Sequence, residues 1–532
     1  MATTDYSKEP GFVAEDVELQ HGAKSHVEEK YMGTDGDKLQ MKVLGRTQET
    51  RRIFTFVSML GFGSTLMVTW EVILANLLAV ITNGGTAGLF WGFLIVVAGF
   101  TLVYASLAEM SSMAPTSGGQ YHWVSEFAPA SCQRYLSYMT GWLCFTGWQS
   151  AITGIGFLVA GIIQGLIILN DANYVPEPFH ATLMTIAVVL FCVFVNIFVA
   201  KRLPLVEGCL AILHFSGLFV VIIVLWVMSP RNNAHDAFLQ LNNGGGWSSD
   251  GLSFMVGLYP LTLCLLGFDS QVHMSEETES ASRSLPRSIM WCTYVNASLG
   301  FIMVVTLIFT MGDLTAIAAT PTGWPFLQVF FNATQSDAGT SVMSLLLILP
   351  LTGSVIACVA TASRQIWLSP ETTASRSLQL SAMYIYPKSS IPLNAIMISL
   401  IVCVLLSLIN LGSTAALNAI LALDLAALLS SYTISIGCIA MKRMRGETLP
   451  ACEWSLGKWG LPINIAALIW LIPIFTFTLF PSVTPVTAVG MNYGCLLFGF
   501  VVVFSTVYYI IVGRHVYISP RERLRRDLQH EL

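Results

Sequence analysis

Charged side chains are scarce in this sequence. Asp, Glu, Lys and Arg make up only 11% of its 532 residues, whereas soluble globular proteins contain about 25%. Hydrophobic residues account for 54%, and the mean hydropathy is +0.68. So little charge cannot cover a surface that faces water, which excludes an ordinary soluble protein and indicates a protein embedded in a lipid bilayer. The formal net charge of −5 gives no indication of a nucleic-acid partner.

Several functional signals are also missing. Residues 1–50 contain neither an apolar signal-peptide core nor a small-residue cleavage site, so we expect the first long apolar run to direct its own insertion. The 11 Cys form no CxxC pair and no Cys/His spacing typical of a metal site. No nucleophile–base arrangement indicates a membrane-embedded enzyme. The sequence therefore predicts a protein that is not an enzyme and needs neither a metal nor an organic cofactor.

Long apolar runs dominate the chain instead. A helix needs about 20 apolar residues to cross a bilayer, and helices are the expected form because every backbone amide must be satisfied without water. These features predict an all-α integral membrane protein with twelve transmembrane helices. The runs lie near residues 53–78, 88–112, 136–169, 180–200, 206–228, 252–272, 289–311, 341–367, 391–411, 416–440, 462–481 and 491–512.

The basic residues predict the orientation of the chain. If the N-terminus is cytosolic and twelve spans alternate, Arg231 is the only one of the 26 Lys and Arg that falls in an outer loop. Both termini are therefore predicted to be cytosolic. The sequon Asn332-Ala-Thr falls in an outer loop and is a candidate glycosylation site. The sequon Asn296-Ala-Ser falls within a span and is expected to stay bare.

The first span contains small residues at its centre, in "VSMLGFGSTLMVTWEVILANLL". Gly61 and Gly63 precede Ser64, and a glycine costs about 1 kcal/mol relative to alanine in a helix. Local unwinding here would expose backbone amides that suit a substrate carboxylate. The alternative is close helix packing through small residues.

The sixth span, "FMVGLYPLTLCLLGFDSQVHMSEE", is weakened in a similar way. Pro260 and Gly267 interrupt it, and Asp269 follows directly. An ionisable side chain within a span costs roughly 3 kcal/mol or more at the bilayer centre, so Asp269 is a functional candidate. The alternative is that Asp269 lies near the inner end of the helix and is hydrated.

Interruptions in the first and sixth spans, five spans apart, are typical of two inverted repeats. We expect spans one to five to form one repeat, spans six to ten the other, and two further helices to follow them. The predicted segments are a disordered cytosolic tail 1–50, a permease domain 51–512 containing repeats near 53–228 and 252–440 and extra helices near 462–512, and a cytosolic tail 513–532.

Other polar residues fall within predicted spans. Glu71 could carry a proton or face an amine, and His214 could titrate near neutral pH, although a lone histidine also serves as a hydrogen-bonded packing residue. Asp424 in the tenth span is a further candidate. Glu109 and Glu207 lie at inner helix ends, where we expect them to be solvated or paired.

Three stretches carry a family resemblance. Residues 104–129 read "YASLAEMSSMAPTSGGQYHWVSEFAP", in which Pro115 ends a helix and Gly118-Gly119 allow a sharp reversal. Residues 267–288 read "GFDSQVHMSEETESASRSLPRS". Both resemble signatures of the amino acid–polyamine–organocation permeases. The opening "RRIFTFVSMLGFGSTLMVTWE" is similar to the fungal amino acid/choline branch of that superfamily.

The resemblance covers about residues 50–512 and implies a twelve-helix fold with a five-plus-five inverted repeat. It implies secondary transport, by alternating access, of an amino acid or related amine such as γ-aminobutyrate or choline. It assigns Asp269 to proton coupling or gating, and Glu71 and His214 are added as candidates for that role. The candidate substrate-binding residues are Gly61, Phe62, Gly63, Ser64, Leu266, Gly267 and Phe268.

The chain departs from the family in two places. It lacks the Ile-Phe that many members carry after the glycines of span one, which weakens the expected carboxylate contact there. After Ser363, Arg364 and Trp367 it loses the family sequence Ala-Arg-Asp-x-Gly-Leu-Pro-Phe. Codons can be chosen so that one inserted T after the Trp367 codon restores that sequence. A local frame slip at about 368–390, leaving an inactive permease, is one hypothesis, and a diverged in-frame loop is the other.

The sequence analysis thus predicts a permease that imports a small amine or amino acid, with a proton as the coupling ion. Coupling to sodium remains an alternative. The protein is expected in the plasma membrane, with the vacuolar membrane as the alternative. A nutrient sensor of the same fold that does not transport is the competing class. The tails of about 50 and 20 residues, too short for the signalling modules of such sensors, favour the transporter.

Overall fold

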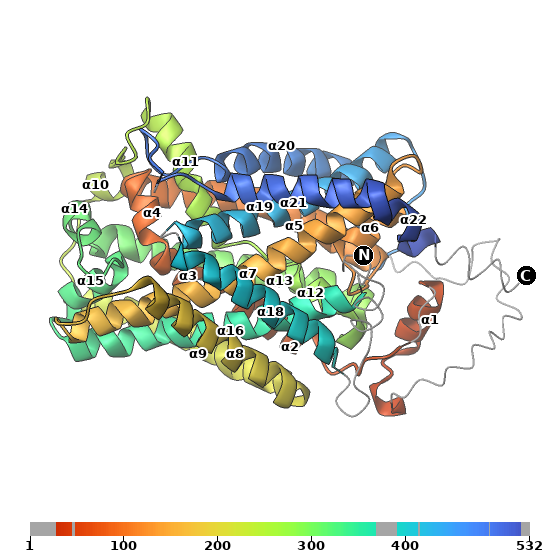
Figure 1. The fold of residues 1–532 in the computed structure, drawn as a ribbon, viewed down its shortest axis with the longest axis horizontal. Coiled ribbons are helices and arrows are strands. Elements are labelled where there is room, and N and C mark those ends of the chain that lie inside the picture. The colour runs from red at the N-terminus through yellow and green to blue at the C-terminus, as the bar shows by residue number, and fades with distance from the viewer. Residues whose placement is uncertain (1–27, 45–47, 369–390, 413–414, 489, 523–532) are drawn as a thin grey trace, which may run out of the picture.

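The computed structural model describes residues 28–44, 48–368, 391–412, 415–488 and 490–522. Regular structure in these ranges is helical, apart from two isolated β-bridges that join Phe54 to Thr278 and Asn83 to Asn243. The long helices run along the longest axis of the molecule (Figure 1). This arrangement confirms the predicted all-α membrane fold. The proposed frame slip at about 368–390 lies outside the described residues, except for Leu368.

Eleven helices within the described ranges are long and apolar enough to cross a membrane. Each corresponds to one of the predicted spans. The sixth predicted span is instead divided into α11 (Asp250–Leu263) and α12 (Ser270–His273). The first predicted span is one of the eleven by its length, but it consists of two helices, α2 (Phe56–Met67) and α3 (Thr69–Ala75). The remaining spans are built on α5 (Gly85–Met113), α7 (Gln133–Asn170), α8 (Pro178–Phe198), α9 (Leu203–Met228), α13 (Ala281–Thr310), α16 (Asp337–Leu368), α18 (Leu393–Leu408), α19 (Ala416–Met444), α20 (Gly460–Thr478) and α21 (Gly494–Tyr508).

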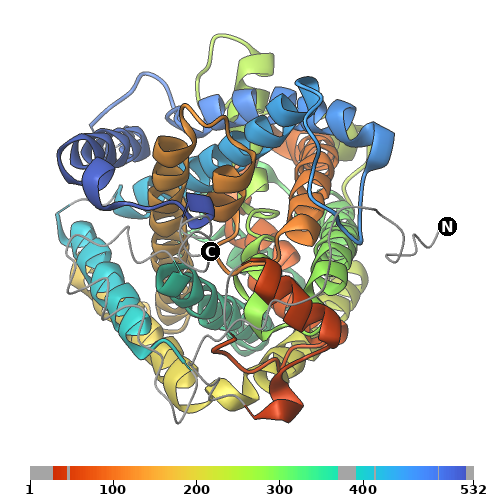
Figure 2. The ribbon, with the colours of Figure 1, turned by 90° about the vertical axis from the view of Figure 1, so that its right-hand side faces the viewer.

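Short helices cover the two ends of the bundle. At one end lie α1 (Asp35–Val43) and α22 (Arg514–Val516), on the right of Figure 1. Figure 2 looks onto this end and shows α1 lying across the ends of the long helices. Because both termini are predicted to be cytosolic, we name it the predicted cytosolic end. The opposite, predicted outer end carries α4 (Leu77–Thr82), α10 (Ala234–Leu239), α14 (Leu314–Ala318) and α15 (Pro325–Thr334).

The helices differ in how far they are buried. In the apolar 18-residue stretch of the span that contains α19, 83% of the residues are buried inside the protein. The corresponding value for the span that contains α21 is 6%. α8, α9 and α18 also expose large apolar side chains, including Phe191, Ile223 and Ile401. An exposed apolar surface of this kind suits contact with lipid rather than water. The spans built on α2, α16 and α19 therefore form the interior of the bundle.

Local sequence explains the turn between α5 and α6 (Gln120–Phe127). α5 ends just before Pro115, and the reversal is completed by Gly119, whose φ of +56° favours glycine. A Cβ on Gly119 would lie 3.0 Å from Cε1 of His273. The turn therefore packs directly against α12, beside the interrupted sixth segment.

The N-terminal tail differs from the prediction. Residues 1–50 were expected to be disordered, but α1 is an ordered helix within them. Thr34 caps α1, because its hydroxyl accepts a hydrogen bond from the Asp37 N–H while the Asp37 carboxylate accepts from the Thr34 N–H. This capping box is a local signal for a helix start that composition alone conceals.

The exposed position of Asn332 in α15, at the predicted outer end, gives a test of the orientation. We expect glycosidase treatment of the protein from a eukaryotic host to lower its apparent mass, and Asn332→Gln to abolish that change. Asn296 is fully buried in α13, so Asn296→Gln is the control and should leave the glycosidase shift intact. A wild-type band that glycosidase does not move would contradict an extracytosolic position for α15.

Candidate functional site

The first membrane-spanning segment is interrupted at Val68, which separates α2 from α3. Its φ of 39° and ψ of 49° lie in the left-handed region, which a β-branched residue rarely adopts. The sequence placed this interruption at Gly61, Gly63 and Ser64, and all three lie within α2 instead. The first break therefore lies about one to two helical turns beyond its predicted position.

The glycine at position 63 serves close packing. A Cβ on Gly63 would lie 2.1 Å from Nε2 of Gln271 and 2.7 Å from Sγ of Cys292. The next residue, Ser64, accepts a hydrogen bond from Nδ2 of Asn296 at 3.2 Å. α2 thus approaches α12 and α13 too closely for a larger side chain. The alternative interpretation of these small residues, helix packing, fits their surroundings in the structure.

The sixth segment is interrupted at Gly267, as the sequence predicts, whereas Pro260, the other residue expected to interrupt it, lies inside α11. α11 ends at Leu263, α12 begins at Ser270, and Gly267 has a φ of +104° that favours glycine. The hydroxyl of Tyr104 in α5 accepts a hydrogen bond from the Gly267 N–H at 3.0 Å and donates one to the carbonyl of Leu265. Backbone at membrane depth requires such partners, so Tyr104 stabilises the interruption.

A cavity of about 50 Å³ lies between the two interruptions. One water molecule needs about 10–15 Å³ of such space, so the cavity can hold a few waters or a small ligand group. Its lining is mostly apolar and comes from α2, α3, α7, α11, α16, α19 and the sixth interruption. The lining residues are Leu66, Met67, Val68, Val72, Asn76, Trp148, Ala151, Ile155, Leu158, Leu263, Leu266, Gly267, Cys358, Leu421, Asp424 and Leu428.

Only part of the predicted substrate-binding set contributes to this lining. Leu266 and Gly267 do so, which agrees with the position predicted for the sixth break. The remaining predicted residues, Gly61, Phe62, Gly63, Ser64 and Phe268, do not line the cavity. Val68, Trp148 and Asp424 line it although no local signal connected them to the breaks, because they become neighbours only when distant helices pack together.

A second cavity, of about 480 Å³, lies next to the first, on the side of the predicted outer end. Asn76, Leu158 and Leu421 line both spaces. The larger space is bordered by α4, α11 and the N-terminal part of α19, and by Phe477, Phe480, Ser482, Val483, Gly490, Met491 and Asn492. We name it the vestibule. The small cavity therefore lies at the inner end of a vestibule that belongs to one end of the bundle.

Asp269 lies beside the sixth interruption and is fully buried. Its Oδ2 accepts a hydrogen bond from Nε2 of Gln120 at 2.5 Å, and its Oδ1 accepts one from the hydroxyl of Tyr432. Nε2 of His273 is 3.8 Å from Oδ2, and Nε1 of Trp148 donates to that ring at 3.3 Å. Asp269 thus connects α12 with α6 and α19, and it is paired rather than hydrated.

Glu71 and His214, predicted separately, lie together in the structure. Nδ1 of His214 is 2.8 Å from Oε1 of Glu71, and both side chains are fully buried. Nε1 of Trp70 also donates to the His214 carbonyl at 3.1 Å. The pair joins α3 to α9, directly beyond the interruption at Val68. Among the described residues, neither Oε2 of Glu71 nor Nε2 of His214 has a hydrogen-bond partner.

The two glutamates expected at inner helix ends are both paired. Oε2 of Glu109 accepts from Arg443 at 2.6 Å, which joins α5 to α19. Oε2 of Glu207 accepts from the hydroxyl of Thr65, which joins α9 to α2. Neither glutamate lines the small cavity. Their contacts brace the helices around the interruptions.

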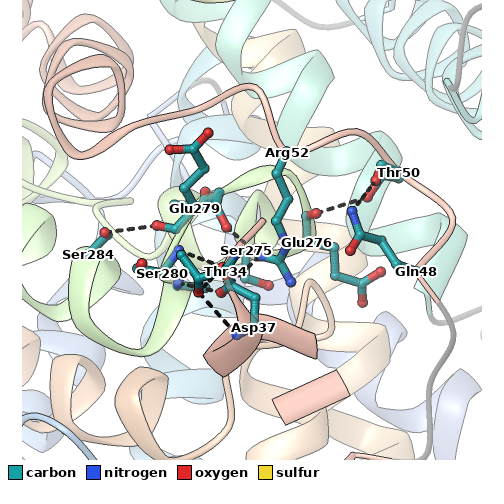
Figure 3. Close-up of polar contacts among 12 residues, drawn as sticks. Thr34, Asp37, Gln48, Thr50, Arg52, Ser275, Glu276, Glu279, Ser280 and Ser284 are labelled. Atoms are coloured by element: carbon teal, nitrogen blue, oxygen red, sulfur yellow. Dashed lines mark hydrogen bonds and ion pairs between the residues drawn. The ribbon is translucent and has the colours of Figure 1, made fainter. Parts of the chain in front are cut away.

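A buried cluster around Arg52 and Asp37 joins several chain segments at the predicted cytosolic end (Figure 3). Nη1 of Arg52 donates to the carbonyls of Ser275 and Thr278, and lies 3.5 Å from Oδ1 of Asp37. The Asp37 carboxylate also accepts from the N–H of Ser280, at 2.9 Å, where α13 begins. α1 and the segment before α2 are thereby fixed to the chain that follows α12.

Two further features belong to this end of the bundle. Nε of Arg364 in α16 pairs with Oε1 of Glu277 at 2.8 Å, and both side chains are buried. Burial lowers the pKa of the Arg52 guanidinium, while Asp37 and the neighbouring glutamates Glu276 and Glu279 raise it. Because a guanidinium remains charged in proteins, the cluster keeps a buried positive charge that these carboxylates compensate.

A bundle of membrane-spanning helices with a cavity between two interrupted helices is typical of membrane transporters. The sequence model of the amino acid permease family matches residues 54–501, so the chain belongs to that family. The choline transporter of Saccharomyces cerevisiae is 29% identical over 89% of this chain and 83% of its own length. Amino-acid permease 2 of Neurospora crassa is 26% identical over 91% and 89%.

The fold has a counterpart among solved structures. The manganese transporter of Eremococcus coleocola, crystallised with an aromatic bis-isothiourea substituted compound, superimposes with a TM-score of 0.51. The match covers 88% of this chain and 95% of the transporter at 13% sequence identity. At that identity the likeness concerns the fold alone, and it confirms the transporter architecture.

The packing role of Gly63 predicts a difference between the two glycines of α2. Gly63→Ala inserts a methyl group against Gln271 and Cys292, and overpacking of this kind costs about 1–3 kcal/mol. We expect a lower melting temperature and a lower yield of monodisperse protein in detergent. Gly61→Ala is the matched control, because its nearest neighbour would be Cβ of Ala211 at 3.9 Å. Equal stability of the two variants would contradict the assignment.

The cluster at the predicted cytosolic end predicts protection of α1 from proteolysis. Asp37→Ala removes the partner of buried Arg52, and breaking a buried ion pair costs about 3–5 kcal/mol. We expect trypsin to cleave after Lys38 and Lys42 at least about tenfold faster in membranes containing this variant, because cleavage follows the open population. Asp35→Ala removes an exposed carboxylate of the same helix and should match the wild type. Equal cleavage of both variants would show that the cluster does not hold α1.

Proposed function

We propose that this protein imports a small amine or amino acid across the plasma membrane by alternating access, coupled to proton entry. One observation carries the proposal: the cavity at the two interruptions adjoins a vestibule at one end of the bundle, while buried ion pairs join chain segments at the other end, which we take to be closed. A transporter needs a central site that reaches one side at a time. The relatives named as a choline transporter and an amino-acid permease support this class of substrate.

The conformational change has identifiable parts. The closed end is fixed by Arg52, Asp37, Glu277 and Arg364, whose contacts attach α1 and α16 to the chain after α12. Release of substrate towards the cytosol requires these contacts to separate. The vestibule must close at the same time, by movement of α4 and α11 towards α19. The interrupted helices lie between the two regions and can transmit the occupancy of the cavity to both.

The proton is assigned to the Glu71–His214 pair. The two side chains are buried and 2.8 Å apart, so a proton can reside on either group at little cost in solvation. Burying an isolated carboxylate is unfavourable, whereas a proton or a cationic partner neutralises it. The pair bridges α3 and α9, so its protonation can alter how the first interrupted segment packs. Asp269 has partners on both oxygens and is assigned to gating.

Uptake of labelled compounds by cells that lack their own permeases tests the function. The panel holds choline, γ-aminobutyrate, spermidine and common amino acids, offered at around pH 5 and around pH 7.5, on either side of an unperturbed histidine pKa. We expect acid-stimulated uptake of at least one compound. Uptake that requires sodium and ignores pH would contradict proton coupling. Surface-expressed protein that transports none of the compounds would contradict the proposed function.

The same assay tests the proton site. Glu71→Gln keeps the shape of the side chain but cannot bind a proton, so we expect the ratio of uptake at the two pH values to fall to near one. His235→Asn is the control, because that histidine is 80% exposed at the predicted outer end, and its ratio should match that of the wild type. An undiminished ratio in Glu71→Gln would exclude Glu71 as the proton-binding group.

A further inference from the structure

The cavity between the interruptions has an asymmetric charge. Among the described residues that line it, Asp424 is the only one with an ionisable acidic side chain, and none is Lys, Arg or His. The remaining lining is apolar except for Asn76, Cys358, the indole of Trp148 and the backbone at Gly267. A space with one carboxylate and no basic side chain can neutralise a positive group, but it offers no ionic partner to a negative one.

Asp424 lacks the partners that a buried carboxylate normally has. Its side chain is in α19 and the residue is 5% exposed, and Oδ1 has no hydrogen-bond partner among the described residues. Asp269, the acidic residue beside the sixth interruption, has a partner on each oxygen. A buried charge without a partner is strongly unfavourable. A positive group bound in the cavity would therefore supply the partner that the Asp424 carboxylate lacks.

The backbone N–H groups of the two residues at the centres of the interruptions are already engaged in hydrogen bonds. The N–H of Gly267, at the centre of the sixth interruption, already donates to the Tyr104 hydroxyl at 3.0 Å. The N–H of Val68, at the first interruption, donates to the carbonyl of Ser64 at 3.1 Å. A zwitterion placed here would pair its ammonium with Asp424 and leave its carboxylate without an ionic partner, at a cost in desolvation.

Trp148 adds a surface that suits an organic cation. Its indole lines the cavity from α7, and its Cη2 lies 3.4 Å from the position that a Cβ on Gly267 would take. The bond from its Nε1 to His273 holds the ring in place. Organic cations bind favourably near indole rings, with a contribution of about 0.5–2 kcal/mol. Asp424 and Trp148 together provide a charge and an aromatic surface in one small space.

We propose that Asp424 is the counter-ion for the ammonium group of the substrate, and that the transported class is small organic monocations without a carboxylate. The proposal rests on the transport function proposed above and narrows its substrate class. The cation enters through the vestibule and passes Asn76, Leu158 and Leu421, the residues that line both cavities. It then loses its hydrating water, and the Asp424 carboxylate takes the place of that water. The contact predicted from the sequence, between a substrate carboxylate and backbone amides of the first break, is not part of this arrangement.

Binding to the purified full-length protein in lipid nanodiscs tests the proposal. Labelled choline is the cationic probe, and the competitors are ethanolamine, glycine betaine, γ-aminobutyrate and the neutral alcohol in which carbon replaces the choline nitrogen. We expect the two cations to bind, and the zwitterions and the neutral isostere to compete poorly. Asp424→Asn should weaken choline binding about 30-fold or more, as for loss of one member of a buried charge pair.

Two further variants control for misfolding. Asp424→Glu retains the charge and should recover part of the affinity, whereas Asp250→Asn removes an exposed carboxylate at the start of α11 and should bind like the wild type. Unchanged choline binding in Asp424→Asn, or zwitterions that bind the wild type as tightly as choline, would overturn the assignment of Asp424. If cells take up a zwitterion and Asp424→Asn does not alter that uptake, only this inference fails. If the wild type neither binds nor transports any compound, the proposed function fails with it.

Discussion

The backbone of the interrupted sixth segment sets the central constraint on this molecule. Within a bilayer each unsatisfied N–H or carbonyl group costs several kcal/mol, so a chain can leave the helical conformation only where other groups replace the lost hydrogen bonds. Tyr104 does so for Gly267 and Leu265. Because those bonds are made, residues 264–269 can remain non-helical, and Gly267 can border a cavity instead of a helix neighbour. The position of α5, the cavity and the gate beside it all depend on this contact.

Two buried aspartates near that cavity have different roles because they have different partners. Asp269 is surrounded by Gln120 and Tyr432, which fix it to α6 and α19, so it responds to the relative position of those helices. Asp424 borders the cavity with an oxygen that no described group satisfies. The first arrangement suits a gate and the second suits a binding site. Burial alone does not separate these roles, since both residues are almost completely inaccessible.

The sequence predicts the helical membrane fold and the sixth interruption well, because both depend on local signals. Apolar length defines the spans, and glycine at position 267 supplies a conformation that other residues resist. The first interruption is mislocated, since Gly63 is needed for packing, and the break falls on Val68, a residue type that gives no local indication of it. Trp148 and Asp424 are far apart in sequence and join the site only through the packing of α7 and α19. The ordered α1 was missed because composition conceals its capping box and because its contacts with Arg52 and the chain after α12 are not local.

An experimental structure of the protein with choline bound, determined by electron cryomicroscopy in nanodiscs, would test the central claim most directly. The account predicts density for the quaternary ammonium between Val68 and Gly267, in contact with the carboxylate of Asp424 and the indole of Trp148. It also predicts that Tyr104 still bridges Gly267 and Leu265 in that state. Density in another part of the bundle, or a ligand that does not contact Asp424, would contradict the assignment of this cavity as the cation site.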